Sequence, residues 1–196
     1  KYTKMVKSKQ EYKNVIVNKP WGYEYLAYEN EHVGLWFLHI NQKHQTSFHC
    51  HPKKDTGLIV LDGAVDVSFF NDINRLVAGR KIMIRKGLFH STKALSENGA
   101  NIFEIETPKI KHDLVRLEDK YGREAKPYEG KSSEEKKSRE CIFFKDPKKD
   151  TKDTYIFSNC KIIVQSILSK DKFMKIQDYE NIIFCFCSKY NNIIFF

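Results

Sequence analysis

The chain has few cysteines and no long apolar segment. These two features argue against a disulfide-rich protein and a membrane-spanning protein. Its five cysteines are an odd number without the spacing of a disulfide framework, which favours a reducing compartment. The longest apolar run, residues 182–187, is far shorter than the ~20 residues that a membrane-spanning helix needs. The sequence also shows no secretory signal. We therefore expect a cytoplasmic protein with no membrane partner.

The chain also lacks the basic surface that nucleic acids require. Its net charge is +9, but residues 1–19 hold +5 of this charge and residues 131–152 hold +3. Residues 20–130 are neutral overall, and all seven histidines lie there, between His32 and His112. No groove-reading motif and no aromatic and basic platform accompanies the charge. We therefore expect no nucleic-acid partner.

What the sequence does contain is a series of short apolar segments of strand length. They are rich in β-branched and aromatic residues, and Gly, Asn and Asp separate them. Up to residue 107 the predicted strands are 23–28, 33–40, 46–51, 58–61, 64–70, 81–85, 92–95 and 102–107. No segment before residue 112 has a helical period. The pattern predicts an all-β fold, either a β-sandwich or a small barrel.

The last part of the chain has a different character. Residues 131–140 contain no apolar side chain and are predicted to form a charged linker. Strand-like segments then recur, so that residues 141–196 are predicted to form a small β-rich unit. This unit ends in Ile-Ile-Phe-Phe, which must be buried in its own fold or against another copy of the chain. We expect a homodimer.

Two histidines at alternate positions of one predicted strand, His49 and His51, are the strongest chemical feature. Alternate side chains of a strand lie on the same face. A third histidine, His90, follows the turn at residues 86–87. In an antiparallel barrel all three can point into one cavity and form a shell for a divalent transition metal. We expect zinc, manganese, iron or nickel.

The residues around these histidines are similar to the two motifs of the cupin superfamily. The HxH pair, a downstream acid and Gly63 resemble the first motif, and residues 79–90 resemble the second in spacing. Within that superfamily the chain resembles the type II mannose-6-phosphate isomerases, which are cupin domains often fused behind mannose-1-phosphate guanylyltransferases. The segments that carry this resemblance are KPWGYEY (19–25), HCH (49–51), FHS (89–91), FEIETP (103–108) and DLVRLEDKYGR (113–123).

The resemblance implies a fold and a domain organisation. Residues 18–130 would form a cupin domain, which is a jelly-roll barrel also called a double-stranded β-helix. Residues 1–17 would be a basic N-terminal arm. The β-rich unit at 141–196 could be an incomplete second cupin, additional strands on the first, or a dimerisation element.

The resemblance also implies metal ligands at His49, His51 and His90. The fourth ligand of the family is an acid that follows the HxH pair. The loop after the pair is two residues longer here, so this position falls on Thr56. We expect the neighbouring Asp55 to be the fourth ligand.

Charged residues near the expected cavity supply the remaining candidates. Glu104 and Glu106 lie on one face of strand 102–107, where a carboxylate could act as the general base on a sugar C–H. We favour Glu106, whose position is polar in the family; the alternative is a solvated pair that faces outward. The candidates for binding an anionic sugar are basic: Lys53, Lys54, Arg85, Arg116 and Arg123. The alternative for the last two is a structural ion pair with a neighbouring aspartate.

The function that the resemblance implies is a metal-dependent aldose–ketose isomerase. Its substrate would be a phosphorylated or nucleotide-linked sugar in polysaccharide or nucleotide-sugar biosynthesis. One alternative is a metal-free sugar-nucleotide epimerase, in which a histidine is the base. Another is a non-catalytic sugar-binding cupin, which the altered acid position favours. A cupin dioxygenase is disfavoured by the sugar-pathway resemblance. The fold alone does not choose among these functions.

Overall fold

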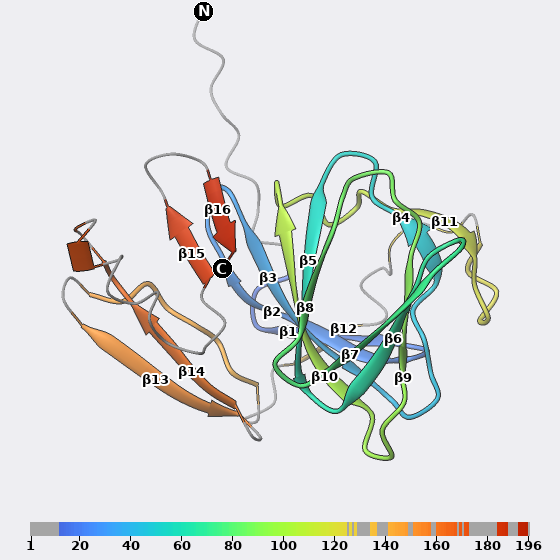
Figure 1. Cartoon of the computed structure of the whole chain (residues 1–196), viewed down its shortest axis with the longest axis horizontal. Helices are drawn as coiled ribbons and strands as arrows, with labels where there is room; N and C mark the ends of the chain where they lie inside the picture. The colour runs from blue at the N-terminus through green and yellow to red at the C-terminus, as the bar shows by residue number, and fades with distance from the viewer. Residues whose placement is uncertain are drawn as a thin grey trace, which may run out of the picture.

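The computed structural model describes residues 12–124, 126, 128, 134–136, 141–148, 151–157, 160–167, 169, 171–172, 184–187 and 192–195. Within these residues the regular elements are antiparallel β-strands (Figure 1). The all-β fold predicted from the sequence is confirmed. Residues 1–11 of the predicted arm and most of the predicted linker lie outside the described residues. In the described part of the chain, no helix has the length and apolarity needed to cross a membrane.

Two layers of strands make up the barrel. Among the described residues, the larger layer is one sheet in the order β12, β1, β2, β3, β10, β5 and β8. Its strands are β1 Val15–Lys19, β2 Gly22–Glu29, β3 Gly34–Ile40, β5 Asp55–Asp62, β8 Lys81–Ile84, β10 Ala100–Thr107 and β12 Glu134–Lys136. The smaller layer contains β4 Phe48–Cys50, β6 Ala64–Ser68, β7 Ile73–Val77, β9 Ser91–Ala94 and β11 Val115–Glu118.

The smaller layer is held together by two isolated backbone pairings. Strands β7, β6 and β9 form one sheet in that order, and β11 pairs with β4. Gln45 pairs with Lys93, and His49 pairs with His90, which joins β4 to the β9 side. The resulting order β7-β6-β9-β4 faces β8-β5-β10-β3 across the barrel (Figure 1). From β3 to β10, successive strands cross between the layers except at the β6–β7 hairpin, which is the arrangement of a jelly roll. The jelly-roll barrel expected from the sequence is therefore confirmed.

The core between the layers follows from the alternation of side chains along each strand. Every second residue of the central strands points inward, and most of these residues are apolar. The buried set includes Trp36, Leu38, Leu58, Val60, Val65, Val67, Ile84, Ala94 and Ile102. The β5–β6 connection turns at Gly63, whose φ of 80° lies in the left-handed region. A Cβ atom there would lie 2.6 Å from the Gly99 carbonyl oxygen, so this tight turn requires glycine.

The outer face of the larger sheet is also apolar, and the C-terminal part of the chain covers it. Phe37, Ile59 and Phe103 point away from the barrel interior and belong to a second buried cluster. Phe144 is part of this cluster, with its ring 5.7 Å from that of Phe103 and 4.8 Å from that of Tyr155. The cluster also packs against apolar residues of the hairpin formed by β13 Lys152–Phe157 and β14 Cys160–Gln165.

A second C-terminal hairpin consists of β15 Phe184–Cys187 and β16 Asn192–Phe195. The described C-terminal residues thus form hairpins rather than a second barrel. Residues of the first hairpin, β13–β14, pack on the outer face of the larger sheet and cover it.

Some strands were not expected from the sequence. They are β1, β7, β11 and β12, and the last of these lies in the predicted linker, where it pairs with β1. Three of the four, β7, β11 and β12, end a sheet and have one neighbour each. A strand at a sheet edge is held mainly by its backbone pairing, so it does not need an alternating apolar pattern.

Replacing Phe144 by alanine should detach the cover from the sheet. We expect Phe144→Ala to lower the free energy of unfolding by roughly 3 kcal/mol, since it removes a buried aromatic ring. Urea denaturation followed by tryptophan fluorescence measures the change. Ile156→Ala, at a side chain that is 70% exposed on β13, is the control and should change stability little. Equal effects of the two substitutions would contradict the packing described here.

Candidate metal centre

Three histidines converge in the barrel. His49 lies in β4, His51 follows one residue after this strand, and His90 directly precedes β9. The pairing of His49 with His90 is antiparallel, with N–O distances of 3.0 and 2.8 Å in the two directions. Paired residues present their side chains on the same face, and His51 shares that face by alternation. One ring nitrogen from each histidine lies within 4.8 Å of the other two, and all three residues are buried. This group could hold a metal ion.

Backbone carbonyls fix the orientation of each imidazole. The Nδ1 atom of His49 lies 2.7 Å from the Ser47 carbonyl oxygen, that of His51 lies 2.6 Å from the Asp113 oxygen, and that of His90 lies 3.0 Å from the Leu88 oxygen. A carbonyl oxygen only accepts, so each Nδ1 donates a proton and each Nε2 keeps its lone pair. The Nε2 atom of His51 is buried and has no hydrogen-bond partner among the described residues. Three imidazoles oriented by backbone carbonyls, together with the buried Nε2 lone pair of His51, fit a transition metal.

The electrostatic environment keeps the three imidazoles neutral. Burial lowers the pKa of His49 well below its ordinary value, and the neighbouring histidines lower it further. Burial likewise lowers the pKa of His51 to about 2 and that of His90 to about 4. The charge of Lys54 contributes to the lowering at all three residues. Neutral imidazoles are the form that binds metal ions.

Asp55, which we expected as the fourth ligand, does not join the three histidines. The described residues contain no carboxylate that belongs to this group. Asp55 begins β5, and its Oδ1 accepts a hydrogen bond of 2.9 Å from the exposed backbone N–H of Lys86. The side chain therefore stabilises the turn after β8. The next residue, Thr56, is buried, and its hydroxyl has no hydrogen-bond partner.

Two of the three histidines open onto a small cavity that reaches the solvent. His49 and His51 contribute to its wall, together with Lys54 and Lys111. Glu104 also lies in this wall, whereas Glu106 does not.

The two expected acids, Glu104 and Glu106, therefore have different roles. Glu106 is 1% exposed and forms ion pairs with Lys54 at 3.2 Å and with Lys111 at 3.3 Å. Glu104 forms no ion pair in the described part of the chain. Burial raises the pKa of Glu104 against the opposing charges of Lys111 and Lys54. Glu104 is thus the acid of this pair that faces the cavity with its carboxyl group available.

A buried charge cluster in the cavity wall was not expected from the sequence. Lys111 lies 2.9 Å from Glu24, and its Nζ is 3.6 Å from the centre of the Trp36 ring. Lys19 lies 3.4 Å from the same carboxylate, and Tyr128 donates a hydrogen bond to it. Lys111 lies in a segment of mixed charge that has no periodic pattern. The inward direction of Glu24 could have been found from its alternation with the flanking tyrosines of β2.

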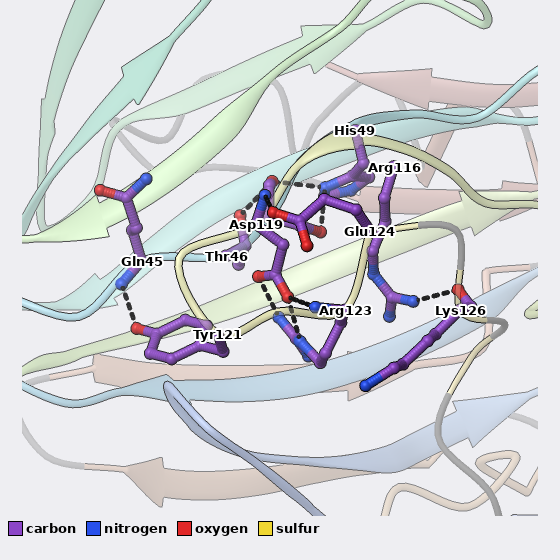
Figure 2. A network of polar contacts seen from close by, with 10 residues as sticks. Gln45, Thr46, His49, Arg116, Asp119, Tyr121, Arg123, Glu124 and Lys126 are labelled. Carbon is purple, nitrogen blue, oxygen red and sulfur yellow. Dashed lines mark hydrogen bonds and ion pairs between the residues drawn. The ribbon is translucent and has the colours of Figure 1, made fainter.

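The two arginines at the rim are held by their neighbours (Figure 2). Arg123 donates two hydrogen bonds to Asp119, at 2.7 and 2.9 Å. Arg116 pairs in register with His49 and donates to the Lys126 carbonyl oxygen at 2.6 Å. Both arginines nevertheless contribute to the cavity wall. The alternative expectation for Arg123, an ion pair with a nearby aspartate, matches the geometry.

The remaining basic candidates are not grouped together. Lys54 is buried in the cavity wall, as described above. Lys53 is exposed, and its backbone N–H donates to the Asp113 carboxylate at 2.7 Å. Arg85 is exposed at the turn after β8. Neither Lys53 nor Arg85 contributes to the cavity wall.

Comparison with known proteins finds similarity at the level of structure. No protein-family model and no curated protein matches the sequence. Similar solved structures include KdgF from Halomonas sp., at 17% identity and a TM-score of 0.44 over 47% of this chain and 84% of that one. A cupin-2 domain protein of Shewanella frigidimarina has 23% identity and a TM-score of 0.40, over 46% and 83%. An oxalate decarboxylase from Bacillus subtilis has 17% sequence identity and a TM-score of 0.48, over 52% of this chain and 30% of that one. The likeness is low, and nothing about the chemistry of this chain follows from it.

Removing one imidazole should abolish metal binding without unfolding the barrel. We expect His51→Ala to lose stoichiometric metal, because two nitrogen ligands cannot replace the shell of three. Elemental analysis of the protein without a histidine tag measures the metal content, and circular dichroism checks the fold. His44→Ala, outside the group of three, is the matched control and should keep its metal. Retention of one metal per chain by His51→Ala would contradict the assignment of His51 as a metal ligand.

The buried carboxylate of Glu24 should make stability depend on acid pH. Burial alone would raise its pKa, but the charges of Lys111 and Lys19 outweigh burial and hold the pKa at about 2, below the ordinary 4.5. A lowered pKa stabilises the folded state above pH 4.5, and this contribution is lost as the pH falls toward 2. The shift corresponds to about 3 kcal/mol.

Urea denaturation between pH 7 and pH 2.5 tests this dependence. The stability difference between the wild type and Glu24→Gln should be largest at pH 7 and should shrink below pH 4.5. Glu97→Gln, at an exposed residue between β9 and β10, is the control and should match the wild type throughout. A difference that stays constant with pH would show that the charge of Glu24 does not stabilise the fold.

Proposed function

We propose that this protein is a metal-dependent aldose–ketose isomerase that acts on a phosphorylated or nucleotide-linked sugar. The observation that carries the proposal is the position of Glu104. Its carboxyl group has a raised pKa and lies in the wall of the same cavity as His49 and His51. An acid whose pKa is raised toward neutrality is suited to take up and release a proton.

The three histidines would hold a divalent ion, which would supply a Lewis acid that polarises a sugar carbonyl and acidifies the neighbouring C–H. Glu104 then removes the proton from that carbon and returns it to the former carbonyl carbon. A single carboxylate can carry this proton in both directions between the adjacent carbons. Isomerisation also moves a second proton from the neighbouring hydroxyl oxygen to the former carbonyl oxygen, and solvent in the open cavity can carry it. The raised pKa of Glu104 makes its carboxylate a stronger base than an ordinary glutamate, which favours removal of the carbon-bound proton.

The remaining charges of the cavity favour an anionic substrate. Lys54, Lys111, Arg116 and Arg123 all contribute to its wall. Glu106 lies behind the wall and holds the first two in place through its ion pairs. We therefore assign Glu106 a positioning role. Arg116 is the basic residue nearest in register to His49 and is our candidate for contacting a phosphate.

Glu104→Gln should remove the proton carrier while leaving the metal in place. We expect kcat to fall by roughly 10²–10⁴-fold with little change in KM, since glutamine cannot accept the proton. The assay converts mannose-6-phosphate to fructose-6-phosphate in deuterium oxide and follows both the product and the deuterium at its C1 carbon. Metal content is measured in parallel and should equal that of the wild type, and Glu97→Gln is the activity control.

The outcome distinguishes the candidate functions. Loss of deuterium incorporation together with turnover supports Glu104 as the acid–base group. A fully metallated wild type that turns over no hexose phosphate and no nucleotide-linked sugar would overturn the isomerase proposal. Calorimetry with the same sugars would then test for a non-catalytic sugar-binding protein.

A further inference from the structure

The group of three histidines lacks the negative charge that a protein acid would bring to a metal centre. Its three donors are neutral imidazoles, and no carboxylate among the described residues belongs to the group. Asp55 is engaged by the Lys86 backbone at the turn after β8. Thr56, at the sequence position expected for the acid, offers only an uncharged hydroxyl. A divalent ion held here would therefore keep both of its positive charges.

A buried fixed charge in the same cavity wall adds to this excess. Lys54 is 1% exposed, lies in the cavity wall with His49 and His51, and has its Nζ 3.2 Å from Glu106. Its charge acts on all three imidazoles. Glu106 shares its charge between Lys54 and Lys111, which lies 3.3 Å from it, although Glu24 also pairs with Lys111 at 2.9 Å. A buried cation beside a divalent ion strongly favours an anion at the open positions, since Coulomb interactions strengthen as water is excluded.

We propose that the centre completes its coordination with an external carboxylate, preferably a small 2-hydroxycarboxylate that offers two oxygen atoms, and that Lys54 provides the buried positive charge that selects it. The site then takes from solution the carboxylate that the chain itself does not supply. The cavity opens to solvent, so such a molecule can reach the centre from solution. The proposal rests on the metal centre and is independent of the isomerase reaction.

The test compares glycolate with glycolamide, which has nearly the same shape and no charge. The wild-type protein is loaded with one cobalt(II) ion per chain, and each compound is titrated while the visible absorption of cobalt is recorded. We expect glycolate to change the spectrum and to bind about tenfold or more tightly than glycolamide, because only glycolate is attracted by the two cations. This comparison needs no variant and does not depend on catalysis.

Two variants separate the contributions. Lys54→Met combined with Glu106→Gln removes the ion pair as a unit, and it should weaken glycolate binding about tenfold while cobalt remains bound. Lys86→Met, at an exposed lysine after β8, is the matched control and should leave glycolate affinity unchanged. Thr56→Glu supplies an internal carboxylate and should abolish the spectral response to glycolate.

Each result decides the proposal. Tight glycolate binding that is weakened in the double variant supports it. Equal affinity for glycolate and glycolamide, or no spectral change with either while cobalt is bound, overturns it and leaves the metal centre intact. Failure of the wild type to bind cobalt overturns both the proposal and the metal centre. Turnover of sugar phosphates has no bearing on these outcomes.

Discussion

The antiparallel pairing of His49 with His90 is the interaction on which the rest of the site depends. Its two backbone hydrogen bonds, of 3.0 and 2.8 Å, connect β4 to the β9 side of the smaller layer. The same pairing places the two imidazoles on one face, where His51 joins them by alternation. A slip of one residue in this register would turn the imidazole of one strand toward the outside of the barrel. The fold and the metal centre therefore require the same register.

A second constraint is the pairing of buried charges beneath the cavity. Lys111 is placed between Glu24 and Glu106, and Lys54 shares the latter. Removal of one partner would leave an uncompensated buried charge, which costs far more than the pair contributes. This network explains why two acids of the barrel are engaged in structural pairs while Glu104 is available to the cavity.

Strand periodicity predicted much of the barrel and the centre of the site. The apolar segments 33–40 and 102–107 correspond closely to β3 and β10, since central strands need the strongest apolar pattern. The spacing of His49, His51 and His90 was sufficient to predict their convergence. Asp55 could not be placed from the sequence, because a longer loop changes which residue points inward. The ion pairs of Glu106 could not be predicted either, because its lysine partners come from other segments of the chain.

The sequence by itself determined the strands, their inward faces and the residue types that meet there. Alternation alone puts Glu104 and Glu106 on the same face of their strand, and His49 and His51 on the same face of theirs, because the period of a strand is two. The tertiary structure decided which of these side chains face the cavity and which are engaged in ion pairs or hydrogen bonds. Lys111 reaches Glu24 across 87 positions of chain, and the Asp113 carbonyl orients His51 across 62. Such long-range partners fix protonation, charge and orientation, and no local pattern encodes them.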